Sequence, residues 1–457
     1  FTKLTIGDGL VSQVPALLIS LAAGLLVTRS GSSSNLPVQF LEQLFGNPRA
    51  LVVAGVFLVL LIVTNLPTLP MATLGIGCVG LAMVMNRQQT AAATAAEAAE
   101  QQRQDAENAP REKRVEDYLS VDPMELAIGM ELLSLADPAR GGDIMQRVGG
   151  VRNQLAGDMG IVMPKVRVRD DATLSPMDYR ISISGNPVAA GTLLPGKLLA
   201  IDSGQTTGMI EGEPTRDPTF GTPAVWIDPL RREQAAIYGY TTVDPSTVVC
   251  THLHEVVRRH AGELLTRDAT KHLIDELREV APTVVDELIP STLKLSDVQQ
   301  VLQRLLDEDV PIRQLSIILE TLGDHAGKTK DPIWLCEYVR HRLARTICTR
   351  HRDNQNRLHV IAVDPAMEDR IAAGVEQTDR GLFVRMSPSA VEATCASIST
   401  AIQSLTERGL PPLVLVSPRI RPALRQLTGP TLPNLRILSY NEISQDTQIE
   451  SLGVAGD

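Results

Sequence analysis

The stretch DPSTVVCTHLHEVVRRHAGELL, residues 244–265, predicts one of the main helices of a soluble domain. Asp244-Pro245-Ser246 is a typical helix start, because an Asp side chain caps free backbone N–H groups and Pro is tolerated in the first turn. Upstream, MPKVRVRDD (163–171) and DYRISISG (178–185) alternate with the period of two that is typical of strands. Helix and strand signals together predict an α/β or α+β fold from about residue 115 onward.

The flanking sequence extends this pattern in both directions. Residues 141–160 place four aliphatic side chains at helical spacing and predict a surface helix. Residues 265–345 are mainly helical, with Val298, Val301, Leu302 and Leu305 on one face. The C-terminal part alternates strand and helix signals, so it predicts a second α/β unit.

Composition limits the classes of function. A formal net charge of −10 over 457 residues argues against a nucleic-acid partner, which normally meets a basic face. The five cysteines are scattered and form no CxxC pair, which indicates free thiols in a reducing compartment. Residues before Gln88 are strongly apolar, whereas those after it are mixed and acidic, so we expect a membrane part followed by a soluble part.

Three uncharged stretches predict transmembrane helices, at about residues 9–27, 50–65 and 69–85. The turn NLPTLP (65–70) separates the last two stretches. One alternative is a single long kinked helix in place of these two spans, and another is a buried hairpin of a soluble protein. The positive-inside rule places the loop Arg29–Arg49 and the chain after Arg87 in the cytoplasm.

The segments at the two ends of this membrane part also carry information. Phe1 follows no basic leader, and we expect that the chain begins within a longer protein. Residues 88–114 are rich in Ala, Gln and Glu and predict a solvated linker. Asp8 stands at the mouth of the first span, where it is either an interfacial, solvated carboxylate or a functional group, since buried charge in a bilayer is costly.

Two motifs suggest chemistry that their context does not favour. GTLLPGK (191–197) fits a phosphate-binding loop, but Leu198 replaces the Mg²⁺-binding Ser or Thr, and strand signals flank it on both sides. Cys250, His252 and His254 lack the ligand spacing of a zinc helix. We therefore expect no catalytic residues, no metal and no cofactor, and the chain does not read as an enzyme.

Several stretches resemble the FHIPEP family of export-gate proteins from bacterial flagellar and type III secretion systems. They include LTIGDGLVSQVPALLISLAAGLLVTR (4–29), DPTFGTPAVWID (217–228), GYTTVDPSTVVCTHLHEVVRRHAGELL (239–265), VQQVLQRLLDEDVPIRQLSIILETL (298–322) and LSYNEI (438–443). The resemblance covers nearly the whole chain except the linker, and the flagellar members are more similar than the injectisome members. The family's N-terminal spans and the loop that gives it its name are absent here.

The resemblance implies an inner-membrane gate with a cytoplasmic homo-oligomeric ring, typically ninefold, that docks chaperone–substrate complexes and takes part in proton-driven export. It implies partners among other export-apparatus membrane proteins, the export ATPase complex and the lipid bilayer. It also implies four subdomains in residues 115–457. These are thioredoxin-like (115–195 with 245–264), inserted ferredoxin-like (196–244), helical (265–345) and a second α/β subdomain (346–457).

Functional positions carry over where the motifs match. The family's chaperone-docking dimple maps onto Asp217, Phe220, Val243 and Thr251, and Asp8 matches the acidic position of a motif that is linked to proton-driven function. An apolar patch with one carboxylate suits a partner helix, whereas ordinary core is the alternative for Phe220 and Val243. A stand-alone membrane transporter with a regulatory domain, and a membrane-anchored NTPase, are the competing functions.

Overall fold

The computed structural model describes residues 121–457 apart from 205, 379, 380 and 457, together with isolated helical positions between residues 15 and 84. These positions fall within the three predicted spans, whereas the rest of those spans, the linker 88–114 and Asp8 lie outside the described residues. Among the described residues, no helix is both long enough and apolar enough to cross a bilayer. The chain divides into two units, Phe1–Val115 and Glu116–Asp457, and the fold below is that of the second.

A mixed four-stranded sheet begins the second unit. Its order is β2-β1-β3-β4; β1 and β2 are parallel, and the other pairs are antiparallel. The strands are β1 Met124–Ile128, β2 Val166–Asp170, β3 Asp178–Ile183 and β4 Asn186–Thr192. Short helices η3 Met130–Leu132, α5 Leu133–Ala136 and η4 Pro138–Arg140 lead to the longer α6 Ile144–Met159. The predicted surface helix is confirmed by α6, whose apolar stripe is buried.

The opening stretch of sequence forms α8 Pro245–Arg259, as predicted. The Asp244 side chain accepts the N–H of Thr247 at 2.9 Å, and Pro245 occupies the first turn. Leu253 and Val257 are fully buried in the main core, which they share with β1 and β3. The helix therefore lies against the first sheet because its apolar face needs that cover.

A second, antiparallel sheet is inserted between β4 and α8. Its order is β6-β7-β5-β8. The elements are β5 Leu198–Ile201, β6 Glu213–Arg216, β7 Pro223–Ile227, η5 Pro229–Arg231, α7 Arg232–Ile237 and β8 Thr241–Val243. It has a small core of its own, and the turn between β4 and β5 contains Gly196 at φ +82°. The strand–turn–strand prediction for GTLLPGK is confirmed.

Seven helices lie between α8 and the next strand, β9, in the described part of the chain. They are α9 Ala261–Leu264, α10 Arg267–Val280, α11 Pro282–Leu288, α12 Leu295–Asp307, α13 Leu315–Ala326, α14 Pro332–Arg342 and α15 Ala344–His351. The four aliphatic residues expected on one face of α12 are all fully buried. Asp309 takes a left-handed conformation after the end of α12, at φ +62°, where the sequence predicts a break before the next helix.

A parallel sheet of order β13-β12-β9-β14 ends the chain. The strands are β9 Arg357–Val363, β12 Leu413–Val416, β13 Arg436–Ser439 and β14 Gln448–Ala455; the other elements are α16 Pro365–Ala373, the hairpin β10 Val375–Thr378 and β11 Gly381–Val384, α17 Pro388–Thr406, α18 Arg421–Thr428 and η6 Tyr440–Glu442. All four residues of β12 are buried, because parallel sheets are covered on both faces.

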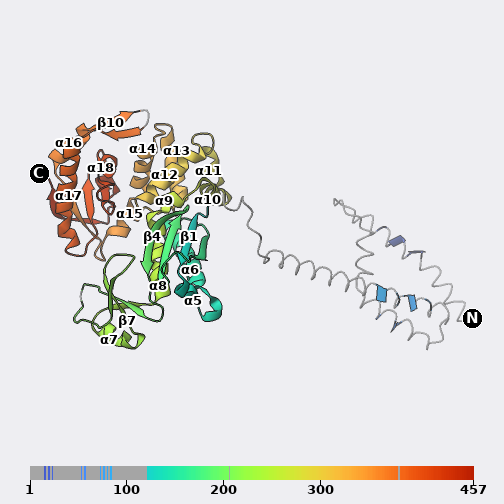
Figure 1. Cartoon of the computed structure of the whole chain (residues 1–457). Coiled ribbons are helices and arrows are strands. Elements are labelled where there is room, and N and C mark those ends of the chain that lie inside the picture. The colour runs from blue at the N-terminus through green and yellow to red at the C-terminus, as the bar shows by residue number, and fades with distance from the viewer. Residues whose placement is uncertain are drawn as a thin grey trace, which may run out of the picture. The chain divides into compact units, whose positions relative to one another are not determined.

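Two cores meet in this sheet. Leu413 and Leu415 belong to the main core that also holds the helices α10–α14, whereas Val414 and Val416 belong to a second core with α16–α18. Figure 1 shows this arrangement within the second unit: α12–α14 lie beside the first sheet on one side and the C-terminal sheet on the other, and the β7 sheet projects away from the helices.

Candidate functional site

The turn between β6 and β7 presents an aromatic ring to solvent. Asp217 is 4% exposed, whereas Phe220 is 63% exposed. The Asp217 carboxylate accepts the N–H of Phe220 at 2.9 Å, and its own N–H donates to the carbonyl of Thr222 at 2.9 Å. Gly221 has φ +71°, a conformation that favours glycine. Asp217 is thus a buried residue that holds the turn, and the ring of Phe220 is the part of the turn that reaches solvent.

Val243 and Thr251 lie where the inserted sheet leads into α8. Val243 ends β8, pairs with Leu199 of β5 and is half-buried against the main core. Thr251 is exposed, two turns into α8. The ordinary-core interpretation is therefore wrong for Phe220 and partly right for Val243.

A buried tyrosine–histidine pair joins β3 to α8. Tyr179 of β3 and His252 of α8 share a hydrogen bond of 2.7 Å between Oη and Nδ1, with the two rings edge to face. Burial and the negative charge of Asp217 raise the pKa of Tyr179 above its ordinary value, and burial lowers the pKa of His252 even though Asp217 opposes that shift. The charge of Asp217 thus acts on both members of this buried pair.

Sequence reasoning missed this pair. His252 drew attention only as a weak metal ligand, while its ring nitrogen is engaged by Tyr179. Gly191 of β4 offers a second sign of close packing, because a Cβ there would lie 2.7 Å from the hydroxyl of Tyr179. No group of three or more His, Cys, Asp or Glu side chains that could hold a metal occurs in the part of the chain that the structure describes.

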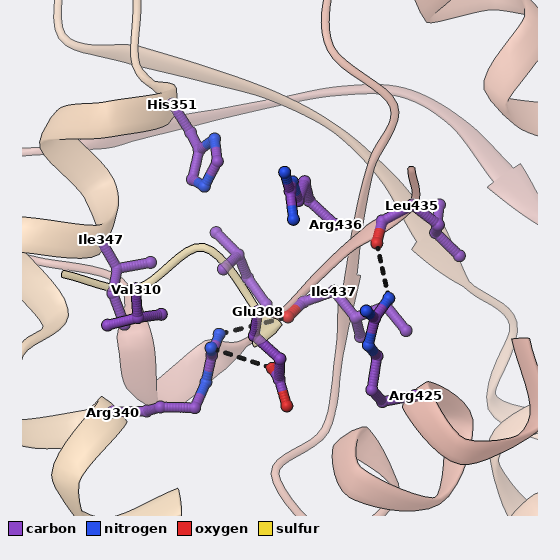
Figure 2. A pocket seen from close by; sticks show the side chains of 10 residues that line it. Glu308, Val310, Arg340, Ile347, His351, Arg425, Leu435, Arg436 and Ile437 are labelled. Atoms are coloured by element: carbon purple, nitrogen blue, oxygen red, sulfur yellow. Dashed lines mark hydrogen bonds and ion pairs between the residues drawn. The ribbon is translucent and has the colours of Figure 1, made fainter. Parts of the chain in front are cut away.

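A buried charge cluster joins the helical layer to the C-terminal sheet. Arg340 and Arg421 are each 2% exposed. The Arg340 guanidinium pairs with Glu442 at 2.6 Å and with Glu308 at 3.0 Å, while Arg421 pairs with Glu308 at 2.5 Å and also with Glu337. Figure 2 shows Arg340 reaching both Glu308 and the carbonyl of Ile437.

The two arginines of this cluster face three glutamates. Burial alone would raise the pKa of Glu308, but Arg421 and Arg340 outweigh it and hold that pKa at about 2. The side chains come from α14, α18, η6 and the end of α12, which lie between Glu308 and Glu442 in the chain. The cluster therefore braces the helical layer against the C-terminal sheet.

The chain resembles known proteins along nearly its whole length. The model of the FHIPEP family matches residues 1–448. The flagellar biosynthesis protein FlhA of Bacillus subtilis is 39% identical over 459 residues, covering 99% of this chain and 67% of the relative. FlhA of Escherichia coli K12 is 36% identical over 458 residues, covering 100% of this chain and 65% of the relative. The chain thus spans about two thirds of the length of these relatives.

Solved structures share the fold of the second unit. Chlamydia pneumoniae CdsV matches with a TM-score of 0.67 at 24% identity, covering 76% of this chain and 100% of that chain. The nonameric SctV-C from EPEC matches with a TM-score of 0.60 at 22% identity, covering 73% of this chain and 98% of that chain. With a family model that matches nearly every residue, the resemblance seen in the sequence is confirmed, and the chain belongs to the FHIPEP family.

Proposed function

We propose that this chain is a component of a flagellar type III protein export gate in the bacterial inner membrane, with residues from about 88 onward in the cytoplasm. The observation that carries the proposal is its similarity along the whole chain to curated flagellar biosynthesis proteins. The chain docks export substrates and takes part in their transport. The proposal includes no enzymatic activity, no metal and no cofactor. The division of residues 115–457 into four subdomains, at the boundaries given above, belongs to this proposal.

The docking surface consists of Phe220, Val243 and Thr251, with Asp217 building the turn beneath the ring. An exposed aromatic side chain is the kind of anchor on which an amphipathic partner helix can dock, and Val243 and Thr251 come from the same inserted sheet and the helix that follows it. The partner class is an export chaperone with its bound substrate. The exposure of Phe220 supports this assignment, because an exposed aromatic ring contributes nothing to the stability of an isolated monomer.

Assembly into a ring follows from the same relationship. The EPEC relative with this fold is described as nonameric, and the Chlamydia CdsV structure was also solved as a complex with CdsO, at 25% identity to this chain. We propose that this chain likewise forms a homo-oligomeric ring, a nonamer by analogy, and contacts other export-apparatus proteins and the export ATPase complex.

The membrane part completes the proposal. Spans at about 9–27, 50–65 and 69–85 cross the bilayer, and Asp8 takes part in the proton pathway that drives export. An injectisome export gate is the second candidate, because the solved structures above come from proteins named CdsV and SctV. The 35–39% identity to several flagellar relatives favours the flagellar assignment.

The purified full chain in detergent, titrated with a flagellar chaperone–substrate complex, tests the docking function. We expect saturable binding of the complex and much weaker binding of the substrate-free chaperone. An injectisome chaperone–substrate complex is the matched comparison, and preferential binding of that complex would transfer the chain to the second candidate. Binding of neither complex would contradict the docking function.

A further inference from the structure

A cleft lined by arginines lies where α8 and α9, the end of α12 and the C-terminal sheet meet. Its volume is about 380 Å³. Its charged lining consists of Arg258, Arg259, Arg425, Arg436, Asp307 and Asp309. Four guanidinium groups thus face two carboxylates, so the lining carries a formal charge of +2. This is a local positive site in a chain whose net charge is −10.

The ion pairs around the cleft do not remove this excess. Asp309 is shared by Arg258 at 2.6 Å, Arg436 at 3.2 Å and Arg350 at 3.2 Å. Glu255 lies behind the lining and pairs with both Arg258 and Arg259. Arg350 and Glu255 add one charge of each sign, so these two partners leave the +2 of the lining unchanged.

Three of the lining arginines have donors that no carboxylate in the described part of the chain occupies. Among the described residues, Arg259 and Arg436 each commit a single nitrogen to an ion pair. Arg425 donates to the carbonyl oxygens of Leu435 at 3.3 Å and Asp307 at 3.5 Å, and neither carbonyl carries a neutralising charge. Figure 2 shows the Arg425 guanidinium directed at the Leu435 carbonyl; Arg436 is the next residue and begins β13.

Burial and the nearby positive charges lower the pKa of Arg436. Burial lowers the pKa of its guanidinium, Asp309 opposes this, and Arg258, Arg425 and Arg350 lower it further. Arginine forks match phosphate oxygens in geometry, and a phosphate monoester carries a charge of about −1.5 to −2 at neutral pH. A dianion would neutralise the cleft, whereas a single carboxylate would leave it positive.

We propose that this arginine cleft binds a dianionic phosphate group, held by Arg259, Arg425 and Arg436. The ligand is either inorganic phosphate itself or a small phosphomonoester. Because its arginines come from α8, α18 and β13, the bound anion would tie the first sheet's main helix to the C-terminal sheet. This inference is independent of chaperone docking.

Calorimetric titration of the full chain in detergent at pH 7.5, with ionic strength held constant by NaCl, tests the site. Inorganic phosphate and glycerol 2-phosphate are the two probes; tighter binding of the second identifies a phosphomonoester as the source. We expect saturable binding of at least one probe, and a Kd about tenfold higher for the double variant Arg425→Gln, Arg436→Gln, which corresponds to about 1.4 kcal/mol. Arg408→Gln, which replaces an exposed arginine in the turn after α17, serves as the control and should leave the Kd unchanged.

Arg259→Gln keeps the proposal testable if the double variant fails to fold, because Arg259 is 53% exposed and its loss leaves the Asp309 pairs intact. We expect a Kd several-fold higher in that variant. Three results would overturn the proposal: no saturable binding of either probe, equal affinity in wild type and Arg259→Gln, or binding of a glutamate-rich peptide in the absence of phosphate binding.

Discussion

The carboxylate of Asp217 accepts the backbone N–H of Phe220 at 2.9 Å, and only the second of these residues is exposed. The acidic residue therefore holds the conformation of the turn, and the aromatic ring is the part that a partner can reach. A substitution at the proposed docking surface can therefore act in two ways, by changing the conformation of the turn or by removing the exposed ring.

Replacement of Asp217 should distinguish turn geometry from charge. Asp217→Ala removes the acceptor for the Phe220 N–H, and we expect about tenfold weaker docking of the chaperone–substrate complex, since one such hydrogen bond contributes about 1–1.5 kcal/mol. Asp217→Asn keeps an oxygen acceptor and should lose several-fold less. Calorimetry with each variant measures this. Equal losses in both variants would mean that the partner reads the charge of Asp217 directly.

Acid sensitivity should depend on His351. Burial and the neighbouring Arg436 lower its pKa to about 4 from an ordinary value near 6.5. The fold favours the neutral imidazole of His351. The stability that His351 contributes to the folded state is therefore fully present above pH 6.5 and is lost as the pH falls toward 4. We expect His351→Gln to reduce the loss of unfolding free energy between pH 7 and 4.5 by up to about 3 kcal/mol.

Urea unfolding at the two pH values measures this effect. His272→Gln is the control, because His272 is 60% exposed and should change nothing. His252 and His254 also have lowered pKa values through burial, so part of the acid sensitivity should persist in the His351 variant. An unchanged pH profile in His351→Gln would contradict the assignment.

The buried charge cluster should be intolerant of losing one member. Arg340→Met removes the shorter of the two guanidinium pairs of Glu442, which is 1% exposed, and leaves only Arg421 at 3.6 Å. We expect a loss of about 3–5 kcal/mol in the free energy of unfolding. Arg385→Met removes the surface pair with Glu376, where Arg385 is 82% exposed, and should cost at most about 1 kcal/mol. Comparable losses in the two variants would show that the cluster does not brace the fold.

Asp8 lies outside the described residues, and its role is tested in the cell. Asp8→Asn in the complete gene should reduce flagellar protein export, because an amide cannot carry a proton as a carboxylate does. Chaperone–substrate binding by the purified chain should not change. Export at the normal rate would assign Asp8 to the solvated membrane interface.

Local signals in the sequence were sufficient for much of the fold. The Asp244 cap, the aliphatic stripe of α12 and the fully apolar β12 each specify their element through neighbouring residues, and each appears as predicted. The hairpin of β10 and β11 and the last strand β14 were not predicted: the hairpin strands are only four residues long, and the eight residues of β14 mix polar and apolar side chains without a clear period.

Contacts between distant residues could not be predicted. Arg340 and Glu442 are 102 positions apart, and Tyr179 and His252 are 73 positions apart, so no spacing in the sequence links them. The candidate docking residues came from the family resemblance, and the exposure of Phe220 is a tertiary property that the residue type alone does not reveal. The arginine cleft likewise depends on three segments that meet only in the fold.

The exposed ring of Phe220 provides the most direct test of the docking account. Phe220→Ala should weaken binding of a flagellar chaperone–substrate complex by tenfold or more, about 1.4 kcal/mol or above. Phe383→Ala is a matched control, because that ring on β11 is 45% exposed and lies outside the proposed surface. We predict a large loss of affinity for Phe220→Ala and none for Phe383→Ala; unchanged affinity for Phe220→Ala, or equal losses in both, would contradict the account.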